Sequence, residues 1–303
     1  MNCEKNDRLF QKKLEEKTAQ IEEIIKAYLP ERSGYQQNIM EAMEYSLLAG
    51  GKRLRPMLMQ ETYHLFGGEG ELIEPFMAAI EMIHTYSLVH DDLPAMDNDE
   101  YRRGRKTTHI VYGEAMAILA GDALLNYAFE TACRAFDMEG ADAGKIGRAL
   151  KILAGKAGIH GMVGGQVVDV ESEGQQITGG KLKFIYRLKT GALIESSMMI
   201  GAVLAGASQD QIQTIESIAG KVGMAFQIQD DILDVEGSRE ELGKPTHSDE
   251  KNQKFTYVMW RGSEDAKREV ERLSMEAMEE LQMFHTDDPY LGMLLESLIH
   301  RKK

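Results

Sequence analysis

No proline occurs between Pro94 and Pro245, so a long central part of the chain lacks the residue that most strongly interrupts a helix. This part is rich in Ala, Leu, Ile, Met, Gln and Lys, and the whole chain lacks the Asn-Gly and Asp-Gly pairs that favour hairpins. Capping-box spacing at residues 33–36 and 208–211 marks two predicted helix starts. The sequence therefore predicts an all-α protein of roughly ten to twelve helices, with a single domain over residues 1–303.

The composition excludes several classes of partner. Lys+Arg number 35 against 49 Asp+Glu, which gives a formal net charge of −14 and argues against binding nucleic acid or anionic membranes. The longest apolar run, residues 198–207, is too short to span a bilayer. With two cysteines and no apolar signal segment at the N-terminus, the sequence favours a cytoplasmic location with no membrane partner.

An acidic cluster, residues 91–100, follows an apolar helical stretch and contains Asp91, Asp92 and Asp97. Carboxylates at the C-terminus of a helix oppose its dipole, so positive partners are expected, and a basic run follows at residues 102–106. Pro94 disfavours a straight helix, so a turn there would bring Asp97 back beside the first two aspartates. The alternative for this cluster alone is a solvated acidic loop.

A second acidic cluster lies on an apolar helical stretch. At 100° per residue, Gln227, Asp230 and Asp234 share one helix face, and Asp231 is adjacent. Like charges four residues apart repel, and partly buried carboxylates need neutralising cations. Oxygen ligands without a nearby Cys/His set select hard cations such as Mg²⁺, whereas a di-iron bundle needs two Glu-x-x-His pairs. A solvated helix face is the alternative.

Because Mg²⁺ usually bridges to substrate phosphates, phosphate-binding cations are expected as well. Arginine offers a planar fork and lysine a point charge for phosphate oxygens. The sequence supplies both types in several segments: Lys52, Arg55, Arg102, Arg103, Lys189, Lys244 and Lys254. On a continuous helix His84 lies within about 20° of Asp91, which favours a shared site, with a core histidine as the alternative. Together these groups indicate diphosphate chemistry.

These residues resemble the trans-isoprenyl diphosphate synthase family, most closely its bacterial farnesyl diphosphate synthases. A single Asp-Asp-x-x-Asp also occurs in terpene cyclases, so the paired motifs and the Gly-Lys-Arg-Leu-Arg-Pro loop carry the resemblance. The similar segments run in family order between about residues 35 and 260: they are residues 51–56, 91–97, 164–169, 189–191, 226–227 and 230–234.

The resemblance implies the isoprenoid synthase fold, with helices around a deep central cavity, and a homodimer. It implies condensation of isopentenyl diphosphate with dimethylallyl or geranyl diphosphate, with about three Mg²⁺ ions. The implied metal ligands are Asp91, Asp92, Asp97, Asp230, Asp231 and Asp234. The allylic diphosphate would contact Arg102, Lys189, Thr190, Gln227, Lys244 and Lys254. Isopentenyl diphosphate would contact Lys52, Arg55, His84 and Arg103.

Product length is expected to depend on Tyr86 and Ser87, because a bulky ring at this place stops the family's product at fifteen carbons. This favours a farnesyl diphosphate synthase. The alternatives are a geranylgeranyl diphosphate synthase, a class I terpene cyclase and a noncatalytic helical subunit. His247 and Phe255 depart from the family pattern, in the segment expected to close over the site.

Overall fold

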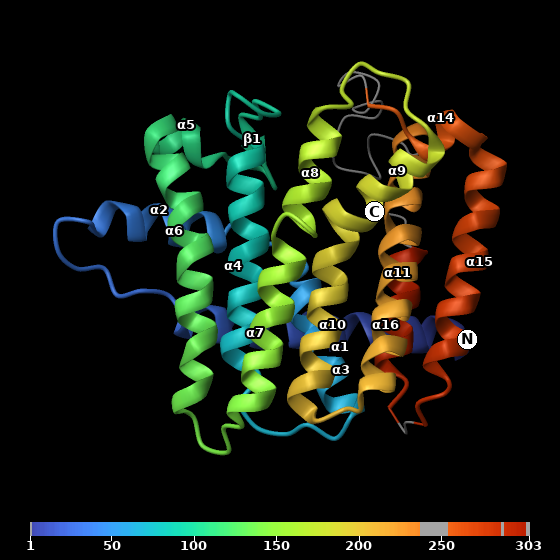
Figure 1. The fold of residues 1–303 in the computed structure, drawn as a ribbon, viewed down its shortest axis with the longest axis horizontal. Coiled ribbons are helices and arrows are strands. Elements are labelled where there is room, and N and C mark those ends of the chain that lie inside the picture. Colours follow the sequence, from blue (N-terminus) through green and yellow to red (C-terminus); the bar gives the residue numbers. More distant parts are fainter. Residues whose placement is uncertain (1, 237–253, 286–287, 301–303) are drawn as a thin grey trace. The chain divides into compact units, whose positions relative to one another are not determined.

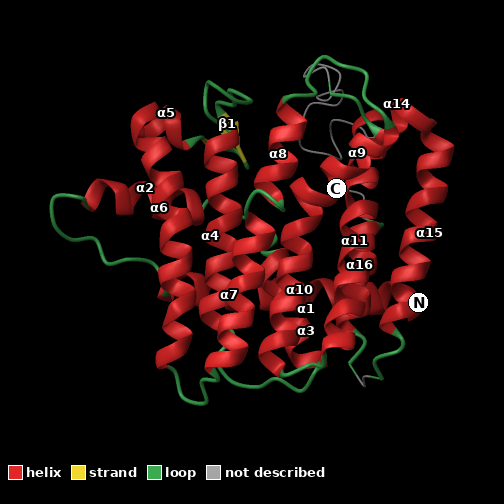
Figure 2. Ribbon diagram, in the orientation of Figure 1, coloured by secondary structure: helices red, strands yellow, loops and turns green. Residues whose placement is uncertain are grey.

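A computed structural model describes residues 2–236, 254–285 and 288–300 of the chain. Figure 2 shows that this part is almost entirely helical. Its two short strands, β1 (Tyr101–Arg102) and β2 (Arg105–Lys106), pair with each other as an antiparallel hairpin. The predicted all-α class is therefore confirmed.

The chain forms two compact units. The first comprises Met1–Gln60 and Glu69–Leu150, and the second comprises Glu61–Gly68 and Lys151–Lys303. Two of the three boundaries between them fall inside α3 (Leu54–Leu65) and α7 (Ala143–Ala157), and the third falls in the loop after α3. A single domain over residues 1–303 stays a prediction.

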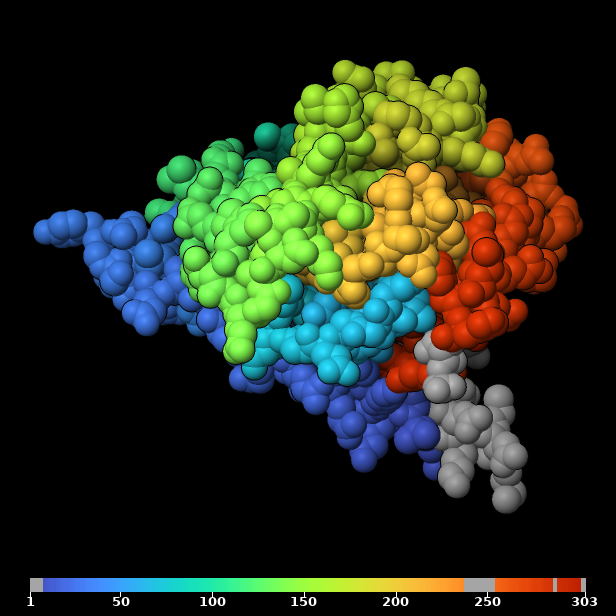
Figure 3. Space-filling view, turned by 60° about the horizontal axis from the view of Figure 1, so that its bottom comes forward, coloured from blue at the N-terminus to red at the C-terminus, as the bar shows by residue number. Residues whose placement is uncertain are grey.

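Helix α4 is central to the first unit and is buried along most of its length. It packs along α6 over several turns and also contacts α1 and α2 (Figure 1). In Figure 3 the loop between α1 and α2 projects from this unit. The elements of the unit are α1 (Asn2–Ala27), α2 (Gln37–Leu47), α4 (Glu74–Asp91), α5 (Thr108–Tyr112), α6 (Glu114–Cys133) and the short η1 (Arg134–Asp137).

A buried ion pair attaches the loop before α3 to α4. The Arg53 side chain is fully buried, and its Nη1 donates to Glu81 Oε1 at 2.7 Å while Nη2 donates to the Leu47 carbonyl at 2.8 Å. The backbone of Arg53 has φ +49°, a left-handed conformation that is costly for a residue with a side chain. An arginine in the core must be paired, so this contact holds the basic loop in one place.

Helix α11 is central to the second unit, where it packs against η2, α10, α14, α15 and α16. The predicted capping box is confirmed at its start, since Ser208 and Gln211 exchange side-chain and backbone hydrogen bonds. The one predicted at residues 33–36 is wrong, because α2 begins after Gln36 without a side-chain cap. The elements are α8 (Met162–Val170), α9 (Gly179–Ile185), η2 (Tyr186–Gly191), α10 (Ala192–Ala205), α11 (Gln209–Glu236), α14 (Tyr257–Arg261), α15 (Ser263–Leu281) and α16 (Tyr290–Ile299).

One helical stretch, Gly179–Ala205, is long and apolar enough to cross a membrane, with a mean hydropathy of 1.3 in its most apolar window. This stretch is longer than the apolar run at residues 198–207. Inside the protein, 83% of its most apolar window is buried. Its only strongly buried carboxylate among the described residues, Glu195, is ion-paired with Lys156. Burial and a paired charge are typical of a core helix.

Candidate active site

The first acidic motif turns back on itself where α4 ends. Asp91 is the last residue of α4, and its carbonyl accepts a hydrogen bond from the Asp97 N–H at 2.9 Å. The turn between them contains Pro94, as the sequence analysis expects. The predicted return of Asp97 to Asp91 is therefore confirmed at the level of the backbone.

Asp92 is buried in this motif and is paired with Arg102 of β1. The Arg102 Nε lies 2.8 and 3.0 Å from the two carboxylate oxygens of Asp92, and its Nη2 lies 2.6 Å from Oδ1. Burial raises the pKa of Asp92, and the bond to Arg102 opposes this shift. The basic run that follows the acidic motif thus supplies a positive partner for Asp92.

Two of the cations predicted for isopentenyl diphosphate, Arg55 and Arg103, lie near His84. Burial, and then the positive charges of Arg55 and Arg103, hold the pKa of His84 well below its usual value. Loss of contact with solvent lowers the pKa of Arg55 to about 10, and it also lowers the pKa of Arg103. Arg103 donates a short hydrogen bond to the Gly50 carbonyl, so it also contacts the loop that carries the exposed Lys52.

One donor of this cluster is unsatisfied. The Nε of Arg55 is buried and has no hydrogen-bond partner among the described residues. A buried donor without a partner is costly, and a neighbouring arginine adds repulsion. Both costs are removed when an anion binds. The cluster of Arg55, His84 and Arg103 is therefore a candidate anion site.

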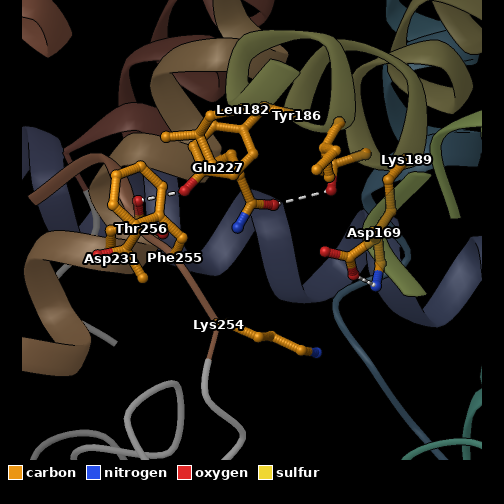
Figure 4. Close-up of a pocket in the computed structure, with 11 residues that line it drawn as sticks. Asp169, Leu182, Tyr186, Lys189, Gln227, Asp231, Lys254, Phe255 and Thr256 are labelled. Atoms are coloured by element: carbon orange, nitrogen blue, oxygen red, sulfur yellow. Dashed lines mark hydrogen bonds and ion pairs between the residues drawn. The ribbon is translucent and has the colours of Figure 1, made fainter. Parts of the chain in front are cut away.

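In the second unit, Lys189 and Thr190 lie on a π-helical turn, η2. Lys189 Nζ lies 2.6 Å from Asp169 Oδ2 of α8, and Thr190 Oγ1 donates to Gln227 Oε1 of α11 at 2.8 Å. The residues of both pairs line one pocket of about 120 Å³, in which Figure 4 labels Lys189, Asp169 and Gln227. A π turn inserts an extra residue into a helix, and such turns are frequent at functional sites.

Two glycines allow this π turn to approach its neighbours. A Cβ on Gly165 of α8 would lie 2.2 Å from the Lys189 nitrogen, and one on Gly223 of α11 would lie 2.8 Å from the Gly191 Cα. Asp169 and Gln227 each lie four residues after one of these glycines, on the same helix face. The close backbone contacts therefore set the distances of the Lys189–Asp169 and Thr190–Gln227 pairs.

The three aspartates of the second acidic motif differ in how deeply they are buried. Asp230 and Asp234 are partly buried, as the apolar surroundings of their helix face predict. Asp231 is only 2% exposed, and its Oδ2 accepts hydrogen bonds from the Tyr186 hydroxyl at 2.5 Å and the Tyr257 N–H at 2.7 Å. Its surroundings thus differ from those of the two neighbouring aspartates.

The predicted residues are found in both units. Lys189, Thr190, Gln227, Asp231 and Lys254 line one pocket of the second unit. Lys244 and His247 lie outside the described residues. Sequence reasoning assigned no role to Asp169 or Tyr186. Asp169 ends the family-like segment at residues 164–169, which was the available signal, whereas nothing in the sequence marks Tyr186.

Comparison with known proteins identifies the family. Residues 36–286 match the Polyprenyl synthetase family. The chain belongs to this family. It is 46% identical to the farnesyl diphosphate synthase of Geobacillus stearothermophilus over 80% of this chain and 82% of that protein. It is 45% identical to the geranylgeranyl diphosphate synthase of Cyanophora paradoxa over 87% of each chain.

The same fold occurs in a solved structure, a geranyltransferase of Helicobacter pylori complexed with magnesium and isoprenyl diphosphate. The TM-score is 0.81 at 32% identity, and the match covers 94% of this chain and 95% of that one. The expected isoprenoid synthase fold and prenyltransferase activity are therefore confirmed, while the relatives differ in their product.

Gly223→Ala is expected to lower prenyltransferase turnover by about tenfold to hundredfold, because a Cβ there displaces the π turn that presents Lys189 and Thr190. Steady-state kinetics of the purified variants measures this. Gly155→Ala is the control, since a Cβ at Gly155 of α7 meets no atom within 4 Å. Equal turnover in the two variants would contradict the assigned contact.

His84 is expected to make folding stability pH-dependent. The unfolded chain binds a proton on His84 near its usual pKa of 6.5 and the folded protein resists it, so the free energy of unfolding falls as pH drops below that value. One such group contributes at most about 1.4 kcal/mol per pH unit. Urea unfolding between about pH 7.5 and pH 5.5 should show a flatter dependence for His84→Gln. The exposed His160→Gln is the control, and an equal flattening there would exclude His84 as the source.

Proposed function

We propose that this prenyltransferase is a farnesyl diphosphate synthase that condenses isopentenyl diphosphate with dimethylallyl or geranyl diphosphate. The observation that carries the proposal is the pair of arginines, Arg55 and Arg103, beside His84, with the buried Arg55 Nε lacking a partner among the described residues. A terpene cyclase ionises one diphosphate, and metal-type carboxylate motifs serve that step. A condensing enzyme needs a second diphosphate site that works without ionisation, and fixed cations suit it.

Isopentenyl diphosphate would bind Arg55, Arg103 and the exposed Lys52. His84 would add a hydrogen bond from its ring N–H to the diphosphate. The diphosphate of this substrate stays attached throughout the reaction. Binding by arginine and lysine is therefore sufficient, and it holds the double bond in a fixed place.

The acidic motifs fit Mg²⁺ by the chemistry of their donors. Asp91, Asp230 and Asp234 are partly exposed and Asp97 is exposed, and all four offer hard oxygen ligands. Within the described part of the chain, no three His, Cys, Asp or Glu residues are arranged to hold a metal ion by themselves. Mg²⁺ suits such sites, since it keeps several waters and shares substrate phosphate oxygens. When bound, it would supply Lewis-acid stabilisation of the departing diphosphate.

The allylic diphosphate would bind Arg102, Lys189 and Lys254, and Lys244 from outside the described residues. These cations stabilise the negative charge that develops as the carbon–oxygen bond breaks. The oxygens of Thr190 and Gln227, which share a hydrogen bond, would face the resulting allylic cation. The isopentenyl double bond attacks its C1, a carbon–carbon bond forms, and a proton passes to the released diphosphate.

A fifteen-carbon product is supported by the surroundings of Tyr86. Its side chain is 6% exposed, and its ring packs edge-on against His90 with centroids 5.8 Å apart. The His90 ring in turn bonds the Ile118 carbonyl at 3.1 Å and lies against Gly121. A ring held in this way cannot easily move aside for a longer chain. A geranylgeranyl product is the second candidate, because the Cyanophora paradoxa relative bears that name.

A homodimer in the cytoplasm completes the proposal. Four large apolar side chains on α5 and α6 are 40–55% exposed, namely Ile110, Val111, Ile118 and Leu119. Several large exposed apolar side chains on neighbouring helices are typical of an interface between subunits. These residues support self-association through α5 and α6.

The decisive experiment is sizing of the product made from labelled isopentenyl diphosphate and dimethylallyl diphosphate with Mg²⁺. We expect predominantly fifteen-carbon product with the wild-type protein and none in the presence of EDTA. A predominant twenty-carbon product would exclude the farnesyl assignment, and turnover with EDTA present would exclude the metal.

Tyr86→Ala is expected to shift the product to twenty carbons or more, because it removes the ring that limits chain growth. Chromatography of the dephosphorylated alcohols measures the shift. Tyr86→Phe is the matched control, since it keeps the ring and should keep the fifteen-carbon product. An unchanged product length in Tyr86→Ala would refute the role of Tyr86.

A further inference from the structure

The buried Asp231 connects three elements around the pocket of the second unit. It lies on α11, and it accepts hydrogen bonds from Tyr186, the first residue of η2, and from the N–H of Tyr257, the first residue of α14. The Tyr257 N–H is also 3.3 Å from the Tyr186 hydroxyl. Figure 4 shows this junction at one end of the pocket, with Lys189 at the other.

Each of the two donors lies close in the sequence to a cation of the pocket. Tyr186 lies three residues before Lys189 on the π turn, and Tyr257 lies three residues after Lys254. Both Lys189 and Lys254 line the pocket. Hydrogen bonds to a buried carboxylate are stronger than those between neutral groups, so the junction restrains both segments.

We infer that Asp231 is a positioning residue that fixes Lys189 and Lys254 relative to each other, and that it is not a metal ligand. This inference rests on the proposed function, in which both lysines bind one allylic diphosphate. The family resemblance assigns all three aspartates of the motif to metal. The three aspartates differ in exposure, since Asp230 and Asp234 are partly exposed and Asp231 is only 2% exposed.

A natural probe reports on this junction. Trp260 is the only tryptophan of the chain and lies on α14. Its ring packs edge-on against Tyr257 with centroids 5.3 Å apart, and it also contacts Gly179 at the start of α9. The fluorescence of Trp260 therefore senses whether α14 is held in place, and it does so without metal or substrate.

The test compares Asp231→Asn with Asp230→Asn, two neighbouring aspartates of the same motif. For Asp231→Asn we expect stronger acrylamide quenching of Trp260 in the metal-free protein. We also expect kcat/KM for dimethylallyl diphosphate to fall by about tenfold or more, with the half-saturating Mg²⁺ concentration unchanged. For Asp230→Asn we expect unchanged quenching and a raised half-saturating Mg²⁺ concentration.

Tyr186→Phe is a milder second variant, because it removes one donor to Asp231 and keeps the ring. It should raise Trp260 quenching and lower kcat/KM in the same direction without changing the Mg²⁺ dependence, even if Asp231→Asn fails to fold. The inference is overturned if Asp231→Asn raises the half-saturating Mg²⁺ concentration as Asp230→Asn does. It is also overturned if Trp260 quenching is unchanged in both Asp231→Asn and Tyr186→Phe. Failure of the proposed function would appear separately, in the product made by the wild-type protein.

Discussion

A charged side chain in the interior of a protein needs an oppositely charged partner, because transfer of an isolated ion from water into the interior costs several kcal/mol. This constraint organises both units of the chain. Arg53 pairs with Glu81, Asp92 with Arg102 and Lys189 with Asp169. Each pair joins two elements that are separate in the sequence, so charge compensation also places the segments that carry the candidate site.

The cluster of Arg55, His84 and Arg103 is an exception to this pairing of opposite charges. Arg55 and Arg103 lower the pKa of this histidine together with burial, and the Arg55 Nε lacks a partner among the described residues. An arrangement of this kind is unfavourable in the unliganded protein. In the proposed function, binding of a diphosphate would offset this cost, as expected for a site that is formed before its ligand arrives.

Much of the site was predictable from local patterns. The turn at Pro94, the helix face of Gln227, Asp230 and Asp234, and the capping box at Ser208 all follow from rules that involve residues close in the sequence. The failed capping box at residues 33–36 has the same spacing, which shows that a local pattern alone does not ensure the bond. The pairing of Asp169 with Lys189 and the burial of Asp231 depend on packing between helices, which no local rule describes.

The amino-acid sequence by itself determined the all-helical class, the family and the residue types proposed to bind diphosphate, because proline spacing, helical periodicity and short motifs are properties of neighbouring residues. Only the tertiary structure decided which of these charges are partnered. The π turn held between Gly165 and Gly223 and the junction at Asp231 arise where helices approach within van der Waals contact. Two adjacent aspartates with the same chemistry thus receive different environments, since successive helix positions point in directions about 100° apart.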